Sequence, residues 1–438
     1  MISDWQASYE ALHQILSEGA YSNLAINKAL AKHKEASPGF VRVQVKGVLR
    51  TLIPLEHLLQ HYTREGREPR PRTKQVLFLG LYALSSMEVP EHAAVNDCVE
   101  LARRCCPGQM SFINAVLRRF VREGKKLLPE EEGPELLAGS SKKQRRLHEI
   151  ARLSLRYSFP EALVGLLHKE YGEETERILA SLNEVPELAL RVNRLKTNRS
   201  ELAEMLREEG ILTVPDPETE AGLLVRKGSP LGGDLFRRGY FSVQSSSSLR
   251  AIEALDPQPG ERVLDLCAAP GGKSAAMAER MDNRGEIVSC DLHAHRVWLI
   301  EEQMKRLGIT IVRAEQRDAA LFREEDRERF DRVLADVPCS GIGVIGSKPE
   351  LRYHVDLGRL PELIELQKQI LRHAAAYVKP GGVVVYSTCT INIRENEEVT
   401  EAVLSESPML TLVETQRIMP YNKNAGFFFA CLRKTGRD

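Results

Sequence analysis

The sequence predicts a multidomain protein with an all-α region at the front, a small α+β module, and a C-terminal α/β region built on a parallel sheet. Three observations support this fold class. Apolar residues recur at helical spacing up to about residue 145, a strand and a helix follow near residues 189–209, and strands alternate with helices after residue 241. We therefore expect domains at residues 1–145, 146–240 and 241–438, as a length of 438 residues favours.

The composition is that of a soluble protein without a metal site. The sequence has no apolar run of about 18 residues and no signal-like N-terminus, so we expect a cytoplasmic protein without a membrane partner. We also expect a monomer, although no feature of the sequence reads out the oligomeric state. Its 8 cysteines form no C-x-x-C pair, which argues against zinc and against a redox motif. Because Lys+Arg and Asp+Glu both number 61, nucleic-acid binding would need a local basic patch.

The front region is predicted to be a helical bundle. Apolar residues share helix faces in two early stretches, namely Tyr9, Leu12, Ile15 and Leu16, and then Val45, Val48, Leu49, Leu52 and Ile53. Further helical runs cover residues 75–87, 93–104 and 112–123. Arg118 and Arg119 on the last run are candidate RNA contacts, although such arginines more often lie on a solvated helix face. Residues 124–147, which include Gly133, Pro134 and Gly139, indicate a linker.

The middle region is predicted to be a small RNA-binding module. Residues 189–196 have the pattern of a strand, and a helix is expected over residues 200–209 with Ser200 as its N-cap. Arg191, Asn193 and Lys196 on the strand could hold RNA phosphates. An exposed strand edge without a ligand explains the same residues equally well.

The C-terminal region is predicted to be a parallel sheet with helices on both faces. The expected strands are residues 262–266, 286–291, 309–314, 332–335, 382–387 and 427–432. The expected helices are residues 274–281, 294–307, 360–378 and 395–405. In such sheets ligands bind at the carboxyl ends of the strands, so the residues that end these strands are the candidates for chemistry.

A glycine-rich turn within residues 263–274 joins the first of these strands to a helix. A P-loop would need glycine at the position of Cys267, and the dinucleotide motif G-x-G-x-x-G is absent. A site for the methyl donor S-adenosylmethionine needs only close backbone approach and nearby acids. We therefore expect this cofactor at the turn, whose residues are Cys267, Ala268, Ala269, Pro270, Gly271, Gly272 and Lys273.

Acids and thiols follow at the ends of the other strands. Asp291 is placed to accept from ribose hydroxyls, and Asp318 from an adenine amino group. Asp336 ends the fourth strand and precedes Cys339, and Cys389 follows the fifth strand. Structural cysteines are usually found in the middle of strands, so two thiols on this edge indicate a function.

Two thiols, an acid and a methyl donor suit the methylation of cytosine at C5. A thiolate that adds to C6 raises the electron density at C5, and an acid at the N3/N4 edge of the base stabilises the adduct. A thiol needs a positive or dipolar neighbour to become a thiolate, and Lys273 or a helix N-terminus could supply one. From the residues alone, either Cys339 or Cys389 could be the nucleophile.

These motifs resemble those of a known family. The string D-L-C-A-A-P-G-G-K at 265–273, Pro338-Cys339 and Thr388-Cys389 resemble the bacterial Sun/Fmu-type methyltransferases, which make 5-methylcytosine in small-subunit (16S) ribosomal RNA. Residues 89–96 and 112–119 resemble the RNA-binding domain related to NusB.

The resemblance implies a NusB-like bundle followed by a Rossmann-like, S-adenosylmethionine-dependent catalytic domain, with ribosomal RNA as the partner. It implies that the glycine-rich turn, Asp291, Asp318 and Asp336 hold the cofactor. It also implies that Cys389 is the nucleophile and that Cys339 assists product release.

The sequence departs from this family in three places. Ser245 stands where aspartate is usual, residues 345–350 lack an Arg-Arg pair, and Ala425 replaces an acid, so the same chemistry on another RNA stays open. A nucleoside triphosphatase with a Walker-B-like strand is disfavoured by Cys267 and by the absence of a glutamate beside Asp336. A non-catalytic RNA-binding or antitermination module is disfavoured by the two strand-end cysteines.

Overall fold

The computed structural model describes residues 2–63, 68–124 and 141–436. The chain forms two compact units, one of Met1–Asn183 with Ile345–Leu357 and one of Glu184–Val344 with Gly358–Asp438. Most of the linker expected at 124–147, with Gly133, Pro134 and Gly139, lies outside the described residues. The helices after the linker belong to the first unit, whereas the sequence placed them with the small module.

The first unit is helical throughout its described residues, as the sequence predicts. Its helices are α1 (Ile2–Glu18), α2 (Ser22–Lys32), α3 (Pro38–Arg50), α4 (Leu52–Tyr62), α5 (Pro71–Ser86), α6 (Glu91–Cys105), α7 (Met110–Arg122), α8 (Lys142–Tyr157), α9 (Glu161–Tyr171), α10 (Thr175–Asn183) and α16 (Leu351–His354). The single helix expected through residue 53 is divided at Thr51, whose hydroxyl donates to the Gly47 carbonyl (2.9 Å). Buried side chains such as Trp5, Leu49 and Phe120 form its core.

A segment far along the chain completes this helical unit. Ile345–Leu357 follows one of the cysteine-bearing loops in the sequence but packs among the helices. The side chains of Lys46 and Arg50 donate to two of its backbone carbonyls (both 2.8 Å), and Arg352 is buried with its guanidinium 4.1 Å from the centre of the Phe159 ring. The segment is too short for its apolar pattern to show that it packs with the helical unit, so the sequence alone places it in the catalytic region.

The small module of the second unit is an antiparallel sheet with the strand order β2-β3-β1-β4. Its elements are β1 (Ala189–Val192), α11 (Arg199–Glu208), β2 (Leu212–Pro215), β3 (Gly222–Lys227), α12 (Asp234–Arg237) and β4 (Phe241–Val243). The N-cap of α11 is Asn198, whose side chain accepts from the Glu201 N–H (3.0 Å), and not Ser200 as predicted. Leu190, Leu206 and Phe241 are part of the module's core.

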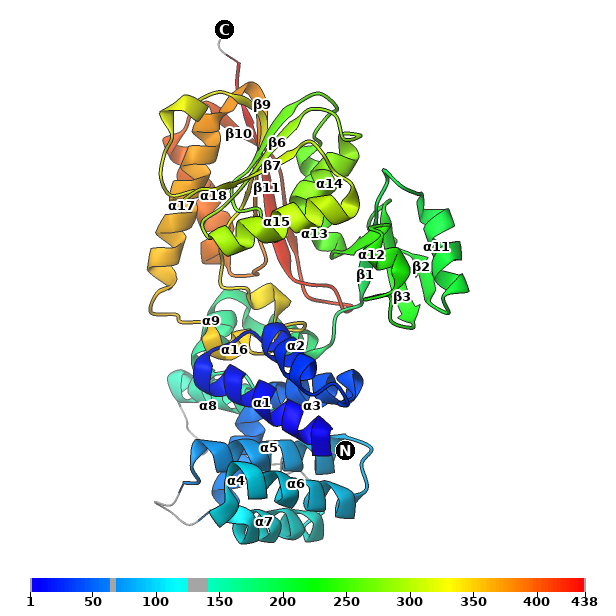
Figure 1. Ribbon diagram of the computed structural model, residues 1–438. Helices are drawn as coiled ribbons and strands as arrows, with labels where there is room; N and C mark the ends of the chain where they lie inside the picture. The colour runs from blue at the N-terminus through cyan, green and yellow to red at the C-terminus, as the bar shows by residue number, and fades with distance from the viewer. Residues whose placement is uncertain (1, 64–67, 125–140, 437–438) are drawn as a thin grey trace. The chain divides into compact units, whose positions relative to one another are not determined.

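The rest of the second unit is a seven-stranded sheet with the order β10-β11-β9-β8-β5-β6-β7. Its strands are β5 (Arg262–Asp265), β6 (Glu286–Asp291), β7 (Val312–Gln316), β8 (Phe330–Asp336), β9 (Val378–Thr388), β10 (Leu410–Ile418) and β11 (Phe427–Lys434). One face is covered by α13 (Ser246–Leu255), α14 (Gly272–Arg280) and α15 (Ala294–Leu307), and the other by α17 (Leu360–Tyr377) and α18 (Glu397–Glu406) (Figure 1).

The sheet differs from the prediction in two respects. It is mixed, because β11 runs antiparallel to both β9 and β10, whereas a parallel sheet was expected. The sequence also missed β10, whose residues, including Leu412 and Val413, are largely exposed and do not alternate between apolar and polar. The strands β5, β6, β8 and β9 do run parallel, so their carboxyl ends share one edge.

Candidate active site

The glycine-rich turn connects β5 to α14. Gly271 is the N-cap of α14 and has a φ of 97°, a conformation that favours glycine. A Cβ at this position would lie 3.1 Å from Met304 Cε and 3.3 Å from Ile300 Cα, so the turn packs closely against α15. A side chain at residue 271 would therefore be strained in both backbone and contacts.

Asp265 ends β5 and is a buried carboxylate with incomplete internal partners. Its Oδ2 accepts a hydrogen bond from the Ser274 hydroxyl (2.6 Å), which in turn accepts from Ser289 (2.8 Å). Its Oδ1 is buried and has no hydrogen-bond partner among the residues that the structure describes. Burial raises the pKa of Asp265 to about 7, and a cationic ligand beside it would relieve that penalty.

The acids expected at the next two strand ends are Asp291, the last residue of β6, and Asp318, which follows β7. Asp291 is 4% exposed, accepts from the His293 N–H (3.1 Å) and pairs with Arg296 (3.4 Å). Asp318 follows β7 and is partly exposed, and its Oδ1 accepts from the Ala320 N–H (2.9 Å). Both carboxylates therefore lie at the same edge of the sheet as the glycine-rich turn.

Lys273 and Asp336 form an ion pair between the turn and the end of β8. The Lys273 ammonium donates to Asp336 Oδ2 (2.6 Å), and the Ser387 hydroxyl donates to Oδ1 (2.7 Å). Burial disfavours charge on Lys273, but Asp336 outweighs it and keeps the lysine pKa above its ordinary value. The ammonium also lies 5.3 Å from the centre of the Phe427 ring. It is therefore a fixed positive charge at the sheet edge.

The two strand-end cysteines meet. Their sulfur atoms, Cys339 Sγ and Cys389 Sγ, are 3.2 Å apart, and both residues are partly exposed and not joined by a disulfide. The hydrogen bond with Cys389 and then burial raise the pKa of the Cys339 thiol well above its ordinary value. The raised pKa favours the thiol form of Cys339 beside the second sulfur.

The loop after Cys339 is locked by a close contact between two glycines. The Gly426 N–H donates to the Gly343 carbonyl (2.8 Å), and the Gly343 N–H donates to the Cys389 carbonyl (3.1 Å). A Cβ on Gly343 would lie 2.1 Å from the Gly426 oxygen, so no larger residue fits. This contact connects the loops after β8 and β9 to the start of β11.

Sequence reasoning missed a set of buried polar residues behind the thiols, namely Gln367, Asn392, Glu395 and Asn396. Residues 395 and 396 were taken as the start of a helix, which instead begins at residue 397. The signal that could have found them is a run of polar residues directly after a strand that ends in Thr-Cys-Thr.

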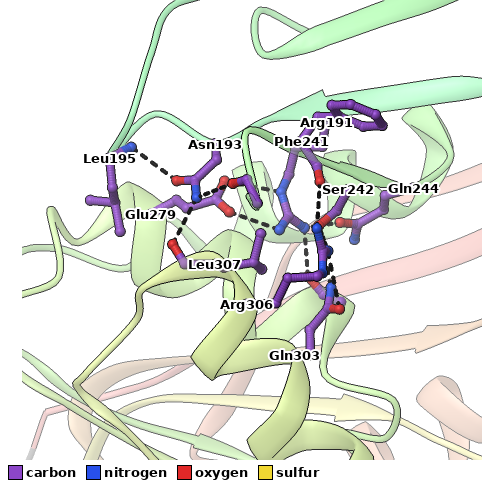
Figure 2. Close-up of polar contacts among 12 residues, drawn as sticks. Arg191, Asn193, Leu195, Phe241, Ser242, Gln244, Glu279, Gln303, Arg306 and Leu307 are labelled. Atoms are coloured by element: carbon purple, nitrogen blue, oxygen red, sulfur yellow. Dashed lines mark hydrogen bonds and ion pairs between the residues drawn. The ribbon is translucent and has the colours of Figure 1, made fainter. Parts of the chain in front are cut away.

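The structure gives Arg191 and Asn193 a structural role in place of the predicted RNA contact (Figure 2). Arg191 is 2% exposed and donates to both carboxylate oxygens of Glu279 (3.0 and 2.8 Å), to the Gly272 carbonyl (2.6 Å) and to Gln244. Asn193 is fully buried and donates to the carbonyls of Gly239 (2.8 Å) and Leu307 (2.9 Å). Side chains without exposed surface cannot contact an RNA phosphate.

Three further basic residues keep exposed surface. Lys196 donates to the carbonyls of Arg238 (2.6 Å) and Arg306 (3.2 Å), so its ammonium is already engaged within the chain. Arg118 donates to Asn114 (2.9 Å) and Arg119 to Glu123 (2.7 Å), both on the exposed face of α7. RNA binding by these three residues stays a prediction.

The described residues meet neither the requirements of a metal site nor those of a membrane-spanning helix. Within them, no group of three or more His, Cys, Asp or Glu side chains could hold a metal ion. Within the same ranges, no helix is both long and apolar enough to span a membrane.

Comparison with known proteins identifies the family. Three family models match the chain: the 16S rRNA methyltransferase RsmB/F model over residues 252–432, the NusB family over 3–122 and the RsmF/B-like ferredoxin-like domain over 159–231. The probable ribosomal RNA small subunit methyltransferase B of Bacillus subtilis is 37% identical over 98% of both chains. The chain belongs to the RsmB/F family of 16S rRNA methyltransferases.

Two further proteins are similar to the chain along almost their whole length. The ribosomal RNA small subunit methyltransferase B of Vibrio cholerae is 32% identical, with 98% of this chain and 96% of the relative covered. The crystal structure of PH0851 aligns with a TM-score of 0.81 and 28% identity over 99% of both chains. The RsmB/F match contains the glycine-rich turn and both cysteines, and the predicted NusB-like bundle and fold class are confirmed.

Proposed function

We propose that the protein transfers a methyl group from S-adenosylmethionine to C5 of a specific cytosine in 16S ribosomal RNA, through a covalent bond between Cys389 and C6. The observation that carries this proposal is the pair of sulfur atoms 3.2 Å apart at the ends of β8 and β9, beside the Lys273–Asp336 ion pair. Membership of the RsmB/F family supports small-subunit ribosomal RNA as the substrate.

The residues at the sheet edge fit S-adenosylmethionine. Asp265 has a buried oxygen without a partner and a raised pKa, both of which suit a cationic ligand. Residues 267–273 would hold the ligand through their backbone, with Asp291 at the ribose, Asp318 at the adenine and Asp336 near the reacting end. When bound, the cofactor supplies an electrophilic methyl group on a sulfonium.

Cys389 is the group that attacks in this proposal. Its thiolate forms a bond to C6, and the electron pair displaced from the C5–C6 double bond makes C5 nucleophilic. After C5 has gained the methyl group, a water molecule takes the C5 proton, the C5–C6 double bond forms again, and the C6–S bond breaks with its electron pair returning to the Cys389 sulfur. Cys339, whose sulfur lies 3.2 Å from that of Cys389, is placed to assist this release.

Lys273 and Asp336 supply the electrostatics. The Lys273 ammonium favours a negative charge on a nearby sulfur, since an opposite charge stabilises a thiolate. Asp336 can accept a hydrogen bond from the N4 amino edge of the base while Lys273 and Ser387 hold its carboxylate in place. Both residues therefore orient and polarise the base without leaving the edge of the sheet.

The test uses labelled methyl donor, unmodified 16S ribosomal RNA and two cysteine variants. We expect Cys389→Ala to give no 5-methylcytosine and no adduct. Cys339→Ala should transfer the methyl group but release the product poorly, so a denaturant-resistant protein–RNA band should accumulate. Cys106→Ala, which changes a partly exposed cysteine in the helical unit, is the matched control and should behave as wild type.

Two results would overturn parts of the proposal. An adduct trapped by Cys389→Ala and none by Cys339→Ala would exchange the roles of the two thiols. Methylation of a transfer RNA transcript but not of 16S ribosomal RNA would keep the chemistry and change the substrate.

A further inference from the structure

Glu395 joins the two loops that carry the thiols. It ends the short helix η5 (Ile393–Glu395), and its side chain is fully buried. Its carboxylate accepts from the backbone N–H of Ser340 (2.8 Å), the Ser340 hydroxyl, Gln367 Nε2 (3.1 Å) and Asn392 Nδ2 (2.9 Å). All of these partners are hydrogen-bond donors, and both oxygens of a carboxylate can accept from them. A glutamine in the same place would point its NH2 group, which can only donate, at some of these donors.

The contacts of Glu395 fix the residues on both sides of Cys339. Ser340 is held directly by the carboxylate. Pro338 is held through Gln367, whose Nε2 donates both to the Pro338 carbonyl (2.9 Å) and to Glu395. The Cys339 loop is thus attached to the buried carboxylate at two points.

The next residue, Asn396, fixes the residues on both sides of Cys389. The Thr388 hydroxyl donates to Asn396 Oδ1 (2.6 Å), and Asn396 Nδ2 donates to the Thr390 carbonyl (3.1 Å). Asn396 is fully buried, like Glu395. Two adjacent side chains therefore each fix the residues that flank one of the two cysteines.

We propose that Glu395 is a positioning residue for product release, because its contacts hold the residues on both sides of Cys339, and that Asn396 is its counterpart for attack, because its contacts hold the residues on both sides of Cys389. This inference rests on the proposed function, which gives the two thiols different steps. A substitution of Glu395 should therefore slow the same step as Cys339→Ala, but to a smaller extent. A substitution of Asn396 should slow the same step as Cys389→Ala, again to a smaller extent. A purely structural role would slow both steps together.

The test compares two nearly isosteric variants, Glu395→Gln and Asn396→Asp, with labelled methyl donor and unmodified 16S ribosomal RNA. For Glu395→Gln we expect multiple turnover to fall about tenfold, which corresponds to one buried charge-assisted hydrogen bond, and the denaturant-resistant adduct to rise. Transfer in a single turnover should change by less than about twofold, because that measurement separates chemistry from release. Asn396→Asp should lower single-turnover transfer and the adduct together.

A second variant keeps the test decisive if Glu395→Gln does not fold. Gln367→Met preserves the size of a buried side chain on α17 but removes the link from Glu395 to Pro338, so it should also raise the adduct. Equal loss of attack and release in the variants that fold, or no change in either, would overturn the inference. If wild type makes no 5-methylcytosine and Cys339→Ala traps no adduct, the proposed function itself has failed.

Discussion

The carboxyl edge of the seven-stranded sheet and the joint between the small module and that sheet are both rich in buried polar groups, but they differ in how those groups are paired. At the joint, every nitrogen of the Arg191 guanidinium has a partner within the chain. At the edge, Asp265 keeps an oxygen that has no hydrogen-bond partner in the described part of the chain, and two thiols face each other. Buried polar groups whose hydrogen bonds are all made within the chain stabilise the fold, whereas buried groups that lack partners can bind a ligand.

The largest expected effect concerns the joint. Glu279→Leu should lower the free energy of unfolding by about 3–5 kcal/mol, because it leaves the Arg191 charge buried without its partner. The double variant Arg191→Met/Glu279→Leu should recover much of this loss, since apolar side chains can fill the same space. Urea unfolding of the three proteins measures both effects. A single variant as stable as wild type would show that the ion pair contributes nothing.

The second expected effect concerns how the free energy of unfolding depends on pH through Asp265, at the carboxyl edge of the sheet. The pKa of Asp265 is about 7 in the fold and about 3.9 in an unfolded chain, so the folded protein binds more protons between these values. Stability from this group is fully present below about pH 4 and is lost as the pH rises through about 7, by at most roughly 4 kcal/mol. Asp265→Asn should flatten the profile of unfolding free energy against pH without ligand. An unchanged slope would assign it to another group.

A third expectation is that the edge binds ligand without supporting the fold. Asp291→Asn should weaken S-adenosylmethionine binding by about tenfold to a hundredfold, which corresponds to ~1.5–3 kcal/mol for a hydrogen bond to a charged group. Its unfolding free energy should change far less than that of Glu279→Leu. Calorimetric titration and urea unfolding separate the two quantities. If Asp291→Asn binds S-adenosylmethionine as tightly as wild type, another residue must bind the ribose hydroxyls.

The smallest expected effect compares two arginines close in sequence. Arg194 is exposed and, with Arg199 and Ser200, lines a surface cavity of the small module, whereas Arg191 is buried. Arg194→Ala should change stability by less than about 0.5 kcal/mol and reduce the salt slope of RNA binding by about 1. Filter binding over a salt series measures the slope. The same slope as wild type would exclude a phosphate contact at this residue.

The sequence was sufficient for the order of the domains and the identity of the edge residues. The glycine-rich turn, Lys273, Asp336 and both cysteines could be found because parallel strands place their ends on one edge. Arg191 could not be judged, since its partner Glu279 lies on a helix far along the chain and no local pattern connects them. Glu395 was missed for a similar reason, because its partners come from three separate segments.

The segment Ile345–Leu357 has a consequence for how the protein is made. The helical unit takes its last helix, α16, from a stretch that the ribosome synthesises only after β8 and the Cys339 loop. Arg352, which is buried, and Tyr353, which is partly buried, therefore reach their places late, and the unit that comes first in the sequence is completed only after residues 184–344 of the second unit have been synthesised. A gene fragment that ends at residue 183 would encode the front helices without the piece that closes them.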